Sequence, residues 1–173
     1  MFIEISCGEA LDRLSILEIK ISEIQDMKKR IEIQKEIDSL SEILPTKQVL
    51  LYYYNLLLRV NKKIWDLTNE IKATTKSDAR FGDLAHTIFE LNQSRFRVKS
   101  VLNRISSSRI QEQKSYGLTE VYIRVEPEHT DTILDTLSEL SLRYDIVNVD
   151  CDESMQTIIL KSVPEFNYRF NQV

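Results

Sequence analysis

Two long stretches of the chain carry apolar residues at alternating spacings of three and four, the pattern of helices that pack along one another. The first stretch keeps this pattern over three heptads, at Leu50, Tyr53, Leu57, Val60, Ile64, Leu67 and Ile71. The second follows a polar segment, with its members at Phe81, Leu84, Ile88, Leu91, Arg95, Val98, Leu102 and Ile105. Arg95 is the charged member of this series. We therefore predict two long bundle helices with one arginine in the seam.

Two shorter helices are predicted before them. The segment SCGE at residues 6–9 fits a capping box, in which a serine hydroxyl accepts a hydrogen bond from the backbone N–H three residues later. The first helix then runs to about Gln25, and a turn near Asp26 leads to a second helix that Pro45 ends. Three serines at 106–108 end the fourth helix. We expect residues 1–117 to form an antiparallel four-helix bundle.

From Glu120 the apolar residues alternate with polar ones, which is typical of a β-strand. A helix is predicted after Pro127, followed by two strand-like runs at 145–149 and 155–163. Residues 118–173 are therefore predicted to form a small βαββ module, which is half of a ferredoxin-like fold. Residues 166–170 are expected to add an edge strand or to contact a second protomer. The predicted fold class is α+β.

The composition indicates a globular protein built mainly from helices. Of the 173 residues, 42% are hydrophobic and 29% are charged, and only three glycines and three prolines are present, which disfavours sandwiches and barrels. No apolar run approaches the ~20 residues that cross a bilayer. The N-terminus also lacks the basic start and cleavage site of a signal peptide. We expect a cytoplasmic protein with no membrane span.

The charge is distributed unevenly between the two predicted domains. Residues 1–117 carry 19 basic and 16 acidic groups, net +3, whereas residues 118–173 carry 4 and 11, net −7. The basic residues between 95 and 114 do not fall on one helical stripe, and the pI is about 5.3. Because nucleic-acid binding prefers a continuous basic surface, we expect no nucleic-acid partner.

Charged and amide side chains are predicted to meet inside the bundle. On a helical wheel, Asp12 and Arg13 lie between two apolar patches of the first helix, and Glu18 lies at the edge of its apolar face. Asn61 lies on the apolar side of the third helix, and Arg95 lies in the seam of the fourth with Asn92 beside it. The candidate ligand-binding residues are Asp12, Arg13, Glu18, Asn61, Asn92, Arg95 and Lys99.

This cluster has two interpretations. Polar seam residues commonly set register and partner choice, and buried charges are retained when they are paired, so a structural role is favoured. Alternatively, the cluster lines a pocket for a small anion or sugar phosphate, because the donors of arginine match phosphate geometry. Sequence templates for catalysis are missing: we find no Gly-rich phosphate loop, GxSxG elbow or HExxH motif. Cys7 and Cys151 form no CxxC pair, and we expect no metal and no cofactor.

Four segments carry a family resemblance: EISCGEALDRLSILEIK at residues 4–20, VNKKIWDLTNEI at 60–71, LNQSR ending at Arg95 and IQEQKSY ending at Tyr116. In this order and spacing, over about residues 3–117, they resemble a domain-of-unknown-function family of short bacterial proteins. The resemblance implies a cytoplasmic helical protein that is often encoded among surface-polysaccharide genes, and it supplies no activity. The module from Leu118 onward is not part of it.

Three functional hypotheses follow. The leading one is a non-enzymatic helical adaptor or regulatory protein, linked by the resemblance to surface-glycan biosynthesis, that forms a homo-oligomer and binds a glycan-biosynthesis protein. The alternative is a protein or enzyme that binds a phosphorylated small molecule or nucleotide sugar at the polar cluster. A third makes the C-terminal module a regulator of the bundle. Whether the chain is an enzyme is left open.

Overall fold

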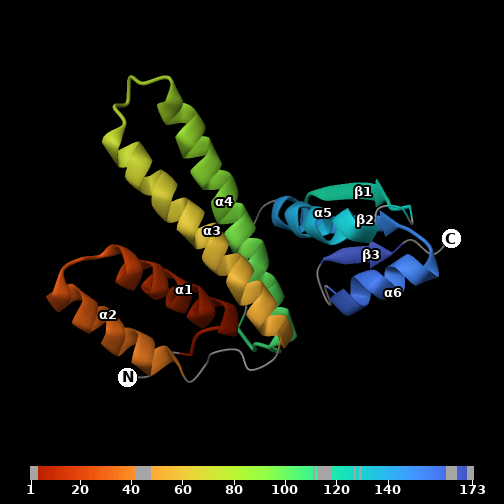
Figure 1. Ribbon diagram of the computed structural model, residues 1–173, viewed down its shortest axis with the longest axis horizontal. Helices are drawn as coiled ribbons and strands as arrows, with labels where there is room; N and C mark the ends of the chain where they lie inside the picture. The colour runs from red at the N-terminus through yellow and green to blue at the C-terminus, as the bar shows by residue number, and fades with distance from the viewer. Residues whose placement is uncertain are drawn as a thin grey trace. The chain divides into compact units, whose positions relative to one another are not determined.

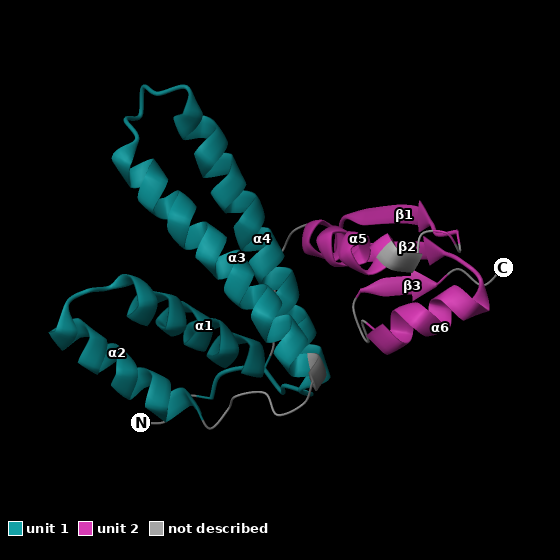
Figure 2. Ribbon diagram, viewed as in Figure 1, with its two compact units in different colours: residues 1–112 teal, residues 113–173 magenta. Residues whose placement is uncertain are grey.

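The computed structural model describes residues 4–41, 48–110, 112, 118–126, 128, 130–162 and 167–170. It divides the chain into two compact units, residues 1–112 and 113–173, which Figure 2 colours separately. The domain boundary predicted at residue 117 lies outside the described residues. The described part contains six helices and one three-stranded sheet, so the α+β class is confirmed. None of the described helices is long and apolar enough to cross a membrane.

The first unit is helical (Figure 1). Its elements are α1 (Cys7–Glu23), α2 (Met27–Leu40), α3 (Gln48–Ala73) and α4 (Arg80–Ile105). The two heptad series coincide with α3 and α4, which run side by side, and α1 packs against α2, α3 and α4. The structure therefore makes α1 the central helix, as its two apolar patches predicted.

The predicted helix starts and stops are largely confirmed. Ser6 caps α1, because its hydroxyl accepts a hydrogen bond from the backbone N–H of Glu9 at 3.1 Å. Asp26 caps α2 by accepting from the backbone N–H groups of Lys28 and Lys29. The last helix of this unit ends just before the three serines. Pro45, the predicted end of the second helix, lies outside the described residues.

The core of the helical unit gathers where α1 crosses α3 and α4. Its largest fully buried apolar side chains are Leu11, Leu14, Tyr53, Leu57, Val98 and Leu102. Each such side chain contributes about 1.5–3 kcal/mol through its removal from water. The distal half of α3 and α4 differs, because the seam residues Ile64, Leu67, Leu84 and Ile88 remain partly exposed there. Helix α2 contains no buried residue.

The second unit alternates strands and helices. Its elements are β1 (Glu120–Arg124), α5 (Thr130–Arg143), β2 (Ile146–Asp150), α6 (Glu153–Ser162) and β3 (Tyr168–Phe170). The strands pair in the order β1-β2-β3, and both pairs are parallel. The unit is therefore βαβαβ, and the predicted βαββ, half-ferredoxin-like arrangement is wrong. The predicted edge strand appears as β3, although residue 166 lies outside the described residues.

The error lies in residues 155–163, which were predicted as a strand and form α6 up to residue 162, with residue 163 outside the described part. Asp152 starts this helix, because its Oδ1 accepts the backbone N–H of Met155 at 2.8 Å. Met155 and Ile159, four residues apart, are buried, whereas Ile158 and Leu160 are exposed. This spacing is helical, and the helix supplies the crossover that a parallel strand requires.

Candidate functional site

Asp12 is the centre of the polar cluster. It lies on α1 with only 1% of its surface exposed. Its carboxylate accepts hydrogen bonds from Arg95 Nε at 2.8 Å and Arg95 Nη2 at 2.5 Å, and from Asn61 Nδ2 at 2.9 Å. The hydrogen bond to Asp12 raises the pKa of Arg95 above its usual value. The two-pronged contact is the geometry in which arginine binds a carboxylate most strongly.

Asn61 connects the third helix to the same point. Its amide also donates to the Ser15 hydroxyl at 2.7 Å, and Ser15 in turn donates to the backbone carbonyl of Asp12 at 2.8 Å. Ser15 and Asn61 are both buried. One carboxylate on α1 therefore joins α3 through an amide and α4 through a guanidinium.

Lys99 forms a second ionic cluster one turn further along α4. Its Nζ lies 2.6 Å from Glu9 Oε2 and 2.9 Å from Glu112 Oε2, and its side chain is nearly buried. Burial lowers the pKa of Lys99, but the hydrogen bonds to Glu9 and Glu112 outweigh this effect and leave the pKa above its usual value. Lys99 is therefore a cation held between two carboxylates.

The start of α1 lies directly against α4. The backbone N–H of Gly8 donates to Asn103 Oδ1 at 2.6 Å, and the N–H of Cys7 donates to the Ser108 hydroxyl at 3.0 Å. A Cβ atom at Gly8 would lie 2.5 Å from the carbonyl oxygen of Lys99 and 2.7 Å from Asn103 Oδ1. A glycine is therefore required for the close approach of the two helices.

The seven predicted residues do not form one site. Asp12, Asn61 and Arg95 meet directly, and Asn92 lies beside them with its Oδ1 3.5 Å from Arg95 Nη1. Arg13 is exposed and instead pairs with Glu36 of α2 at 2.9 Å.

The other two predicted residues have different partners. Lys99 belongs to the cluster with Glu9 and Glu112. Glu18 is half-buried near Tyr54, and burial together with this carboxylate raises the pKa of the Tyr54 phenol. A ligand-binding role for any of the seven stays a prediction.

Sequence reasoning missed six contributors: Gly8, Glu9, Ser15, Asn103, Ser108 and Glu112. Ser15 could have been found, because a serine three residues after a buried aspartate can bond back to its carbonyl. Glu9 was assigned only to the helix cap, and its carboxylate pairs with Lys99 on a different helix. That contact depends on how α1 and α4 pack, which no local pattern contains.

This arrangement is a structural lock, by which we mean a set of paired polar groups that holds α1, α3 and α4 together. The two oxygens of Asp12 receive three donors, and Lys99 faces two acids, so both charges are compensated in place. The side chain of Arg95 keeps 27% exposure and is the most open part of the Asp12 network. Within the described ranges, no three His, Cys, Asp or Glu side chains gather in a way that could hold a metal ion.

Comparison with known protein families identifies the family of this chain. The model of a family of unknown function, DUF6165, matches residues 1–127, which include the whole helical unit and strand β1. No curated protein and no solved structure matches the chain. The match covers well over half of the sequence and extends beyond the residue at which the resemblance was expected to end. The chain therefore belongs to the DUF6165 family of unknown function.

Proposed function

We propose that this protein is a non-enzymatic helical adaptor or regulatory protein that works in the cytoplasm as a homo-oligomer. The observation that carries the proposal is the saturation of Asp12, the most buried charge of the candidate site. A general acid or base must reach a substrate atom within hydrogen-bonding distance. Asp12 already accepts hydrogen bonds from Arg95 and Asn61, and only 1% of it is exposed. The network is suited to holding three helices together.

Self-association is supported by the distal half of α3 and α4. There the apolar seam residues remain partly exposed, and Phe89 on α4 is 55% exposed. The same segment of a second copy would cover these side chains, because a symmetric dimer brings the same surface of each copy together. In this proposal, the α3–α4 pairs of two copies pack against each other, and the antiparallel four-helix bundle expected within residues 1–117 stays a prediction.

The oligomer is tested by sedimentation velocity on the full chain over a range of concentrations. We expect a dimer that Phe89→Asp converts to a monomer, since a carboxylate cannot be buried without a partner. The matched control is Thr87→Asp, at another exposed position of the same helix. A wild-type chain that stays monomeric at every concentration, or equal effects of the two substitutions, would remove the oligomer from the proposal.

The proposed cellular role is in surface-glycan biosynthesis, through binding to a protein of that machinery. It is supported by the resemblance to proteins encoded among surface-polysaccharide genes. The test is deletion of the gene in its own organism, followed by analysis of the amount and chain length of surface glycan. We expect a changed glycan that the wild-type gene restores and that Phe89→Asp does not. An unchanged glycan after deletion contradicts this role.

A second candidate function is supported by the partial exposure of Arg95. Its guanidinium edge lies beside Asn92, where a phosphate of a sugar nucleotide could reach it. A thermal-shift screen with inorganic phosphate and nucleotide sugars tests this alternative. The variant is Arg95→Lys, which keeps the positive charge and loses the paired N–H donors of the guanidinium. Stabilisation of the wild type that Arg95→Lys abolishes would favour the ligand site over the lock. No shift with any compound would exclude it.

A further inference from the structure

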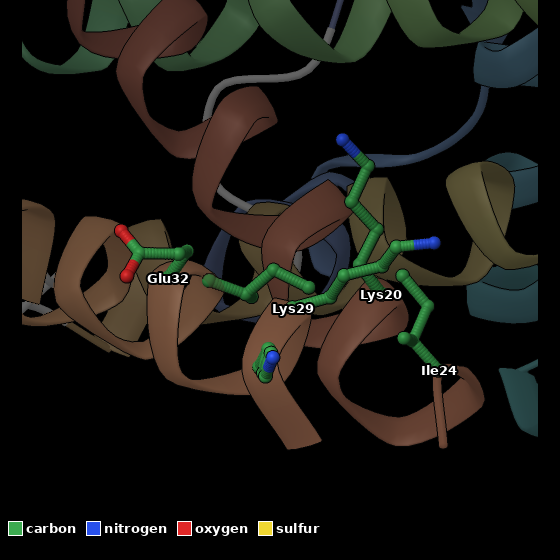
Figure 3. Close-up of a pocket in the computed structure, with 6 residues that line it drawn as sticks. Lys20, Ile24, Lys29 and Glu32 are labelled. Atoms are coloured by element: carbon green, nitrogen blue, oxygen red, sulfur yellow. The ribbon is translucent and has the colours of Figure 1, made fainter. Parts of the chain in front are cut away.

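A groove of about 430 Å³ lies between the end of α1 and the start of α2 (Figure 3). This volume falls within the roughly 300–1,000 Å³ typical of small-molecule sites. The groove is lined by Lys20 and Ile24 of α1 and by Lys28, Lys29, Glu32 and Ile33 of α2. It is separate from the Asp12 network, and nothing in the adaptor role accounts for it.

The groove has apolar walls and a constrained turn behind it. Ile24 and Ile33 are half-buried, and the methylene stems of lysines add apolar surface. Arg30 fixes the turn between the helices, because its Nη1 donates to the carbonyl oxygens of Ile21 at 2.5 Å and Ile24 at 3.2 Å. The walls are therefore held in position before any ligand arrives.

Three cations around the groove are uncompensated within the part of the chain that the structure describes. Among the described residues, no carboxylate pairs with Lys20, Lys28 or Lys29, whereas neighbouring Lys35 pairs with Glu32 at 2.7 Å. That pairing neutralises Glu32, the acid that lines the groove. Figure 3 shows Glu32 at the opposite end of the groove from Ile24, with Lys29 and Lys20 between them.

The position of two of these lysines is also unfavourable for the helix itself. Lys28 and Lys29 lie in the first turn of α2, which contains no acidic residue. The helix dipole is positive at this end and favours anions there. Departures from such local rules are expected at functional sites. An anion in the groove would give these lysines a partner.

We propose that the groove binds one anionic amphiphile, with its phosphate or carboxylate head among Lys20, Lys28 and Lys29 and its apolar chain along Ile24 and Ile33. The head is held by ammonium groups, because Asp26 already occupies the backbone N–H groups of Lys28 and Lys29. The lysines attract the head, and the isoleucine walls select a molecule with a chain over a free phosphate ion.

The test is a titration of the full chain with dodecyl phosphate below its micelle concentration, followed by calorimetry and amide NMR. We expect saturable binding of one molecule, with the largest shifts at residues 20–33. Inorganic phosphate should bind at least about tenfold more weakly, because it lacks the methylene groups that the apolar walls remove from water. Dodecyltrimethylammonium, which has the same chain and the opposite charge, should not bind saturably. Dodecyl phosphate that does not saturate a site overturns the proposal.

Variants distinguish specific binding in the groove from general electrostatic attraction to the protein. Lys29→Glu should weaken dodecyl phosphate binding at least about tenfold, and Ile33→Ala should weaken it while leaving the weak phosphate binding unchanged. The control is Lys63→Glu, an exposed lysine on α3 that changes the net charge equally. Equal weakening by Lys63→Glu contradicts a specific site. Binding to anionic vesicles without binding to the monomeric amphiphile would assign the surface to membranes and also overturn the proposal.

Discussion

At the scale of single residues, the structure depends on a buried aspartate. Removing two charges from water is costly, and the cost is recovered only when every lone pair and donor is used. Asp12 meets this condition through Arg95 and Asn61. The pair need not add net stability over an apolar core, but the loss of one partner is expensive because the other charge is left behind.

Asp12→Ala is therefore expected to lower the free energy of unfolding by about 3 kcal/mol. This value is at the low end for a buried pair, because Arg95 is partly exposed and water can hydrate its guanidinium once Asp12 is removed. Arg13→Ala, at the next position, should cost under about 1 kcal/mol, since its pair with Glu36 is exposed. Urea unfolding followed by circular dichroism measures both. Equal losses would contradict the buried lock.

We expect Tyr54 to limit the stability of the protein at alkaline pH. Its pKa is raised above the usual value by burial and by Glu18. Above about pH 10 the unfolded chain releases this proton while the folded chain retains it, so the folded state binds more protons and stability falls as pH rises.

We expect the urea midpoint to decline above about pH 10, and Tyr54→Phe to make that decline shallower. A residual decline should remain, because the pKa of Lys99 is also raised. Tyr122→Phe is the control, since this tyrosine is 71% exposed and its substitution should leave the decline as in the wild type. A Tyr54→Phe chain with an unchanged alkaline profile would show that this phenol does not limit stability.

The meeting of Asp12 and Arg95 was predictable, because a charge that interrupts an apolar repeat must find a partner inside the bundle. The position of Arg13 was not, since a wheel of one helix cannot show that α2 reaches across to it. Lys99 was predicted as a candidate ligand-binding residue, but its carboxylate partners were not. Its two carboxylate partners, Glu9 and Glu112, lie near opposite ends of the sequence of the helical unit, although both contact Lys99 in the fold.

At the scale of elements, helices with long repeats were predictable and the short element α6 was not. Over 26 residues, α3 accumulates enough repeats to exclude any other structure. The ten residues of α6 contain adjacent isoleucines that are equally typical of a strand. Two features favoured the helix: the cap at Asp152 and the four-residue spacing of Met155 and Ile159. Both are visible in the sequence, but each is weak alone.

The contact between α1 and α4 is tested by glycine substitution. Gly8→Ala should cost about 2 kcal/mol, because the added methyl would overlap the backbone of Lys99 and Asn103 Oδ1. Gly82→Ala is the matched change, since nothing lies within 4 Å of the position that its added methyl would take. It should stabilise the protein by about 0.5 kcal/mol through helix propensity. Opposite signs in urea unfolding are expected, and a neutral Gly8→Ala would contradict the close approach.

At the scale of the whole molecule, the chain joins two units of different composition. The helical unit contains its own core and its own ionic clusters, and the parallel sheet unit packs around Leu137, Val147, Val149 and Ile159. The charge difference between the two parts was visible in the sequence. The parallel order of the strands was not, because it depends on α6.

A chain that ends at residue 117 is expected to fold alone, since Asp12, Asn61, Arg95, Lys99 and Glu112 are all retained. Circular dichroism should show a cooperative urea transition, and size-exclusion chromatography should show a compact species. Asp12→Ala in the short chain should again lower the midpoint. An unfolded or molten short chain would mean that the C-terminal unit is required for the helical fold, and would exclude a separable regulatory role for it.

The central position of α1 has a consequence during synthesis. Asp12 and Arg95 are 83 positions apart, so the first helix leaves the ribosome long before its ionic partner exists. At roughly 5–20 residues per second, this interval lasts about 4 to 17 s. During it, Asp12 lacks its guanidinium partner and the side of α1 that packs against α4 remains uncovered. The contacts of α1 with α2 and α3 can therefore form before its contacts with α4.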